Sequence, residues 1–150
     1  MTSVTLQHWL SSGWLSAHKS SPQEIKNLLA LADRDIAECR ITGLSPDWLL
    51  NIAYNAALQA SAAALAAAGY RASRESYHFR VIQSLAYTIG APPHIVQLFD
   101  QFRKKRNIGG YERTGLISEQ EAAEMLELAK KIRNSVEDWL RTAHPALHPD

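Results

Sequence analysis

The residues best suited to chemistry lie in one short basic segment, residues 103–113. Four consecutive cations are followed by an amide, a glycine pair, a tyrosine and a further arginine: Arg103, Lys104, Lys105, Arg106, Asn107, Gly109, Gly110, Tyr111 and Arg113. Guanidinium groups match the oxygens of a phosphate, and paired glycines let the backbone bend sharply beside a ligand. The segment therefore predicts a site for the phosphate of a nucleotide or of RNA.

A structural interpretation of the same segment is also open. Four positive charges at the end of a helix oppose the negative end of its dipole, and they can lie on a solvated face. The glycines would then only close a turn between two helices, and Tyr111 would pack as an aromatic cap. In that case the protein would be a helical protein–protein adaptor.

Two further groups of polar residues could line a cleft. Asn51 and Asn55 belong to a stripe that recurs every four residues and therefore follows one helix face. That stripe could equally be a solvated edge. His78, with Arg74 and Arg80 nearby, could supply a second basic face or a proton-transferring group.

No metal or cofactor is expected. Glu75 and His78 have the Glu-x-x-His spacing of di-iron bundles, but such a site needs a second pair of this kind, and the sequence has none. The chain contains no phosphate-binding glycine loop and no dinucleotide-binding motif. The single cysteine, Cys39, falls in an apolar helical stripe, which favours a packing role.

The elements that must position these residues are nearly all helices. Helix-start signals and glycine stops predict helices near 22–42, 46–68, 75–89, 93–106 and 119–141, after a short imperfect one within 4–18. The alanine-dense helix 46–68 is expected at the centre, because small side chains permit close helix approach. We therefore expect an all-α, up-and-down bundle of four to five main helices with a short N-terminal helix, in one domain over 1–141, and a flexible tail over 142–150.

Composition excludes several classes of protein. The chain has 150 residues and a net charge of +1, so any affinity for nucleic acid must come from a local patch. One cysteine permits no internal disulfide, and no apolar run is long enough for a membrane span. Without a recognisable secretion signal, a cytoplasmic location is expected.

The order of these features resembles the HEPN domain family of prokaryotic helical proteins. The resemblance covers roughly residues 21–141. It is carried by the stretch WLLNIAYNAALQASAAALAAAGY, the histidine-containing SYHFRVIQSLAYTIG, the basic helix end IVQLFDQFRKKRN, the glycine loop with a tyrosine, and the final helix opened by SEQEAAEMLELAKKI.

That resemblance implies a homodimer that pairs with a minimal nucleotidyltransferase in a toxin–antitoxin module. The catalytic members are metal-independent ribonucleases with an Arg-x4–6-His motif and often a polar residue after the arginine. Arg106 and Asn107 match the first two positions, but Tyr111 stands where the histidine belongs. Tyrosine, with an ordinary pKa near 10, is a poor base at neutral pH.

The resemblance thus leads to two hypotheses beside the adaptor. In the first, Arg106 and Tyr111 bind a nucleotide or RNA phosphate without efficient catalysis, and the protein is chiefly the partner of a nucleotidyltransferase. In the second, it is an endoribonuclease toxin that uses Arg106 with Tyr111 or recruits His78. Tyr111 could also receive a nucleotidyl group from such a partner.

Overall fold

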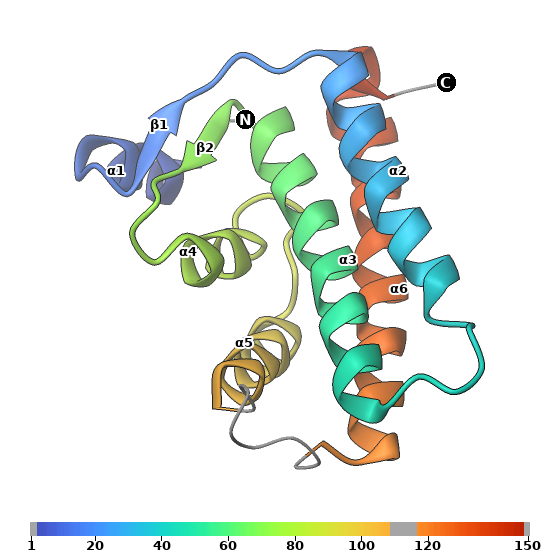
Figure 1. Cartoon of the computed structure of the whole chain (residues 1–150). Helices are drawn as coiled ribbons and strands as arrows, with labels where there is room; N and C mark the ends of the chain where they lie inside the picture. The colour runs from blue at the N-terminus through green and yellow to red at the C-terminus, as the bar shows by residue number, and fades with distance from the viewer. Residues whose placement is uncertain (1–2, 109–116, 149–150) are drawn as a thin grey trace.

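Three long helices form the main layer of the computed structural model, which describes residues 3–108 and 117–148. They are α2 (Pro22–Glu38), α3 (Pro46–Ala67) and α6 (Glu119–Ala143), and α3 packs against both of the others (Figure 1). Most of the shorter elements lie on the other side of α3: α1 (Val4–Ser11), β1 (Leu15–Ala17), β2 (Tyr70–Ala72), α4 (Tyr77–Ser84) and α5 (Pro93–Ile108). The expected all-α bundle with a short N-terminal helix is confirmed.

The alanines of α3 explain its central place. Eight alanines between Ala53 and Ala67 are buried, and with Leu50, Tyr54, Ser61 and Leu65 they cover almost the whole circumference of the helix. Small side chains let α2 and α6 approach closely. The faces that α2 and α6 turn towards α3 are apolar, with Ile25, Leu29, Ala32, Met125, Ile132 and Val136 among the buried residues.

Helix starts follow the signals in the sequence. The hydroxyls of Ser21 and Ser45 accept hydrogen bonds from backbone amides in the first turns of α2 and α3, and a proline follows each serine. Ser118 and Glu121 form the reciprocal capping box expected at the start of α6. On the outer surface, Arg133 of α6 donates two hydrogen bonds to Asp33 of α2, at 2.7 and 3.0 Å.

A short strand pair follows the N-terminal helix, and the sequence did not predict it. The N-terminal helix ends at Ser11, and residues 15–17 pair as a strand with residues 70–72, with Leu15 opposite Ala72. Gly13 and Gly69, at φ +84° and +101°, provide the backbone reversals that precede the two strands. The pair is stabilised by a small second core around Leu6, Leu15 and Tyr70.

The histidine-containing helix is also shorter than expected. It was predicted to continue to residue 89, but α4 ends at Ser84, and residues 85–89 form turns. Ser84 lies fully buried at that end; its hydroxyl donates to the Val81 carbonyl, and its own carbonyl accepts from the Tyr87 and Thr88 amides. This backbone connection lets the chain turn towards α5.

After α6 the chain forms a 3-10 helix, Pro145–Leu147, in the segment for which a flexible tail was expected. The His148 imidazole approaches Glu137 to 3.6 Å, and the ring of His144 packs edge-on to Trp139 at 4.8 Å. None of the helices in the described ranges has the length and apolar character that crossing a lipid bilayer requires.

Candidate functional site

A basic groove opens between the start of α4 and the second half of α5. It has a volume of about 470 Å³ and is lined by Arg74, Ser76, Tyr77, His78, Phe79, Arg103 and Arg106. Three of these seven residues are arginines, and none is acidic. The lining therefore favours an anionic ligand over a cationic one.

Arg106 is the most unusual of the arginines. Its guanidinium carbon lies 5.0 Å from the centre of the Tyr54 ring, which places the cation over an aromatic face. Its Nε–H is buried and has no hydrogen-bond partner among the described residues. A buried donor without an acceptor is costly, and the part of the Arg106 side chain that lines the groove is where an oxygen-rich ligand can meet this cation.

Arg103 lies one turn away on the same face of α5, and local contacts hold it. Its Nε donates to Asp100 Oδ1 at 2.7 Å, and its guanidinium carbon lies 5.4 Å from the centre of the Phe79 ring. Asp100 is largely buried, so it offsets part of the charge of Arg103. Arg103 therefore helps to shape the groove, whereas Arg106 has more hydrogen-bonding capacity left for a ligand.

Tyr54 forms the floor under these groups. It is fully buried in α3, and its ring packs edge-on to Phe99 at 5.5 Å. Its Oη lies 2.9 Å from His78 Nδ1, within hydrogen-bond distance. Burial raises the pKa of Tyr54 to about 12, against the opposing effect of Arg106, so the phenol stays protonated at neutral pH. Tyr54 thus acts as a fixed, neutral support for both His78 and Arg106.

His78 is a neutral imidazole beside the cationic side chains of Arg103 and Arg106. It is half-buried, and burial followed by the charges of Arg106 and Arg103 holds the pKa of its imidazole below the ordinary value. When Nδ1 carries the proton and donates to Tyr54 Oη, Nε2 is left as an acceptor. An anion bound in the groove would counter the arginine charges and favour the protonated imidazolium.

The backbone at the start of α4, beside the groove, has an unusual conformation. Ser76, the residue before the helix, has φ 54° and ψ 35°, a left-handed conformation that is rare for residues other than glycine. Its side chain makes no capping hydrogen bond. The first turn therefore lacks the usual serine cap, although the Tyr77 amide donates to the Arg74 carbonyl at 3.3 Å.

The structure brings together only part of the predicted phosphate site. Arg103, Arg106 and His78 line the groove, but Lys104 and Lys105 point elsewhere on α5. Lys104 approaches Asp100 to 3.6 Å, and Lys105 pairs with Glu121 at the start of α6. Tyr111, Arg113 and the side chain of Asn107 lie outside the described residues, so the predicted pairing of Arg106 with Tyr111 is not described.

The two asparagines proposed as cleft-lining residues are not part of the groove lining. Asn51 is half-buried, and its amide donates to the Asp47 carbonyl at 2.9 Å; Asn55 is also half-buried. Of the two arginines near His78, Arg74 lines the groove, whereas Arg80 donates to Ser73 and lies over Trp14. Cys39 is buried in the main core, as expected, and burial raises its pKa to about 11.

Sequence reasoning missed four residues of the site: Tyr54, Ser76, Tyr77 and Phe79. Helix periodicity could have shown which of the four cations in residues 103–106 share a helix face. Arg103 and Arg106 are three residues apart and so share a helix face, while Lys104 and Lys105 point away from it. Nothing local indicates that Tyr54, about fifty positions earlier, lies beneath them.

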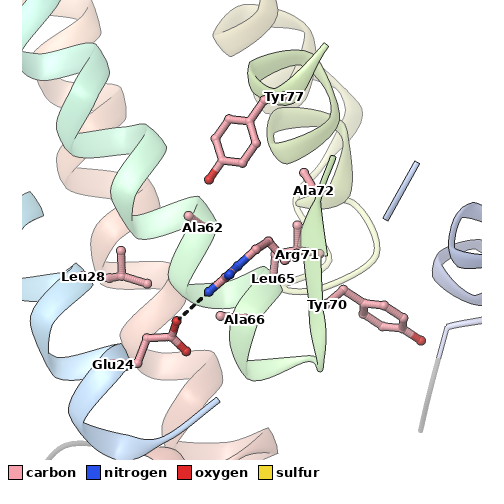
Figure 2. Close-up of a pocket in the computed structure, with 9 residues that line it drawn as sticks. All are labelled: Glu24, Leu28, Ala62, Leu65, Ala66, Tyr70, Arg71, Ala72 and Tyr77. Atoms are coloured by element: carbon pink, nitrogen blue, oxygen red, sulfur yellow. Dashed lines mark hydrogen bonds and ion pairs between the residues drawn. The ribbon is translucent and has the colours of Figure 1, made fainter. Parts of the chain in front are cut away.

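A second cavity, of about 140 Å³, lies between α2, α3 and β2 (Figure 2). Its walls combine apolar side chains, among them Leu28 and Leu65 on the helices, with polar groups, and the Tyr77 hydroxyl points towards it. Glu24 accepts hydrogen bonds from Ser20 at 2.6 Å and Arg71 at 3.4 Å, and it also contacts His18. These polar groups already pair with one another, so the cavity offers a ligand fewer unsatisfied hydrogen-bonding groups than the basic groove does.

Within residues 3–108 and 117–148, no group of three or more histidine, cysteine or acidic side chains is arranged to hold a metal ion. Comparisons of the chain with protein-family models, with curated proteins and with solved structures gave no significant match. The function is therefore inferred from the geometry of the groove.

Proposed function

We propose that this protein binds the phosphate groups of RNA or of a nucleotide in the basic groove. The observation that carries the proposal is Arg106: a guanidinium placed over Tyr54, with a buried Nε–H that has no partner among the described residues. Arg74 and Arg103 add positive charge to the same groove. A phosphate supplies several acceptor oxygens and the negative charge that this arrangement lacks.

The net charge of +1 makes the local arrangement decisive. Nonspecific attraction to a polyanion by the whole molecule is weak, so binding must come from the groove. At neutral pH His78 contributes no full charge there, because its pKa is lowered. The binding energy at pH 7 is therefore assigned mainly to the arginines.

The direct test is a titration of a fluorescent 12-nucleotide RNA and of a labelled nucleotide with purified protein. Arg106→Ala should weaken binding by about 10-fold or more, since a hydrogen bond to a charged group contributes roughly 1.5–3 kcal/mol. Arg106→Lys should recover only part of this, because an ammonium lacks the planar fork. Arg141→Ala, which removes an exposed arginine on α6, is the matched control and should leave the affinity unchanged.

Equal affinity of the Arg106→Ala variant and the unaltered protein, both folded by circular dichroism, would remove the groove as the binding site. Failure of the unaltered protein to bind either ligand in low salt would reject the function altogether. The adaptor interpretation would then be the better account of the fold.

The HEPN resemblance of residues 21–141 supports the wider part of the proposal, a homodimer that pairs with a nucleotidyltransferase. Light scattering would measure the mass of the particle, which should be twice the 16.7 kDa of the chain. Co-purification with the product of a neighbouring nucleotidyltransferase reading frame would test the partner. If the protein is a monomer and captures no such partner, the homodimer and the nucleotidyltransferase pairing are rejected, and only phosphate binding in the groove remains proposed.

One observation favours a second function, that of a metal-independent endoribonuclease. His78, a neutral imidazole, lines the same groove as Arg106. In this reaction a ribose 2′-oxygen attacks the adjacent phosphorus, the bond to the 5′-oxygen breaks, and His78 Nε2 takes the 2′ proton. Water protonates the departing 5′-oxygen, and the products are a 2′,3′-cyclic phosphate and a 5′-hydroxyl.

An RNA cleavage assay separates this function from simple binding. We expect cleavage, if it occurs, to fall by about 10²–10⁴-fold in His78→Gln, which is the usual contribution of a general base. His94→Gln, an exposed histidine at the start of α5, is the control. Cleavage that survives both His78→Gln and Arg106→Ala would place the reaction elsewhere, and no cleavage at any pH would leave binding alone.

A further inference from the structure

The groove contains an aromatic ring that phosphate binding does not require. Phe79 lies in the first turn of α4, lines the groove, and is 37% exposed. A large apolar side chain exposed inside a basic groove gains nothing from an isolated phosphate. It does offer a surface on which a planar group can stack.

The placement of Phe79 relative to the cations is informative. The guanidinium carbon of Arg103 lies 5.4 Å from the centre of the Phe79 ring, and Arg106 lies one helical turn further along α5. The groove thus holds stacking groups and phosphate-binding groups within one volume of about 470 Å³. That volume is in the range of pockets that bind small molecules, and a nucleotide combines a planar base with a phosphate.

We propose that the groove binds an unpaired nucleotide unit, with its base stacked on Phe79 and its phosphate held by Arg106. This inference rests on the proposed function and adds the class of ligand: single-stranded RNA or a free nucleotide rather than duplex. In a duplex each base is paired and stacked on both faces, so no base is available to an aromatic side chain.

The charge distribution also argues against a duplex. Double-stranded RNA is bound through contacts to phosphates and 2′-hydroxyls that extend over many base pairs. Here the arginines of the groove are gathered in one small volume, and the neighbouring cations Lys104 and Lys105 are engaged with acidic side chains. One unpaired nucleotide fits this compact arrangement better than a long helical surface does.

The test measures four ligands in parallel by titration: a 12-nucleotide single-stranded RNA, the same strand annealed to its complement, a mononucleotide and inorganic phosphate. We expect the single strand to bind more tightly than the duplex, and the mononucleotide more tightly than inorganic phosphate. Tighter binding of the strand than of the mononucleotide would identify a chain as the ligand, and equal binding would identify the free nucleotide.

The matched variants are Phe79→Leu, which keeps an apolar side chain but removes the ring, and Phe79→Trp, which keeps a stacking surface. Phe79→Leu should weaken single-strand binding by roughly 5- to 150-fold, the range for loss of one stacked base. Phe79→Trp, which keeps a ring, should bind the single strand about as tightly as the unaltered protein does. Tyr87→Leu, at an aromatic residue 43% exposed outside the groove, should have no effect.

Salt dependence separates lost stacking from a displaced arginine. If only stacking is lost, Phe79→Leu lowers affinity without changing the slope of log affinity against log salt; if Arg103 has moved, the slope falls as well. A slope that falls along with the affinity would overturn the stacking assignment. So would duplex binding as tight as the single strand, or unchanged affinity in Phe79→Leu while Arg106→Ala remains defective. Absence of binding to all four ligands would instead reject the proposed function, and the inference with it.

Discussion

Tyr54 is the residue whose substitution tests the site and the fold together. Its hydroxyl contacts His78 Nδ1 at 2.9 Å, one face of its ring supports Arg106, and it packs edge-on to Phe99. Tyr54→Phe removes only the hydroxyl. The lost hydrogen bond and the half-buried nitrogen left without a partner should lower the free energy of unfolding by about 1–2 kcal/mol.

Tyr54→Leu removes the ring as well. To the lost hydrogen bond it adds the loss of an aromatic pair, about 0.5–1.5 kcal/mol, and of the cation–π contact, about 0.5–1 kcal/mol. The total decrease in the free energy of unfolding should be about 2–4.5 kcal/mol. Because Arg106 then loses its support, RNA affinity should fall by about 2- to 5-fold, whereas Tyr54→Phe should leave affinity almost unchanged.

Urea denaturation and RNA titration of the two variants measure both effects. Tyr70→Phe is the control, because this second buried tyrosine makes no hydrogen bond through its hydroxyl within the described residues. A loss below about 0.3 kcal/mol in Tyr54→Phe would refute the role given to the hydrogen bond. Full RNA affinity in Tyr54→Leu would refute the role given to the ring.

Three other predictions concern charge. With three arginines in the groove, the slope of log RNA affinity against log salt should be about −2, and Arg106→Ala should bring it to about −1.4; an unchanged slope would mean that Arg106 touches no phosphate. Burial and the neighbouring arginines lower the pKa of His78 in the folded chain, so the unfolded chain binds more protons below about pH 6.5, and stability should fall as the pH drops through that value. Urea denaturation between pH 5 and 7.5 checks this, and His78→Gln should show a smaller dependence; an identical pH profile would speak against it. Arg133→Met should lower the free energy of unfolding by about 1 kcal/mol, because it breaks the link between α2 and α6, whereas Lys130→Met, in an exposed pair with Glu127, should cost less than about 0.5 kcal/mol; equal losses in thermal melts would contradict this.

The fold could be predicted from the sequence wherever local chemistry decides it. Ser21, Ser45 and Ser118 start their helices because each hydroxyl accepts a hydrogen bond from an amide three residues later. The strand pair could not be predicted, because residues 15–17 pair with residues 70–72 across the whole of α2 and α3, so the contact is not local in the sequence. Three-residue strands carry too little alternation to be recognised from sequence.

The site likewise contains residues that the sequence indicated and one that it did not. Residue type predicted that Arg103 and Arg106 favour an anion, and helix periodicity could have set them apart from Lys104 and Lys105. The contribution of Tyr54 depends on how α3 packs against α4 and α5, which the sequence does not reveal. Tyr54 is buried among the alanines of α3, yet its hydroxyl contacts His78 and one face of its ring supports Arg106.

The alanine-rich α3 has a consequence for how this protein can change over generations. A methyl group has no rotamers, so the central helix cannot adapt to a new neighbour by turning its side chains. Any gain or loss of volume on α2 or α6 must be compensated on those helices themselves. We therefore expect paired, volume-conserving exchanges between α2 and α6 among descendants of this chain, around a nearly invariant alanine spine.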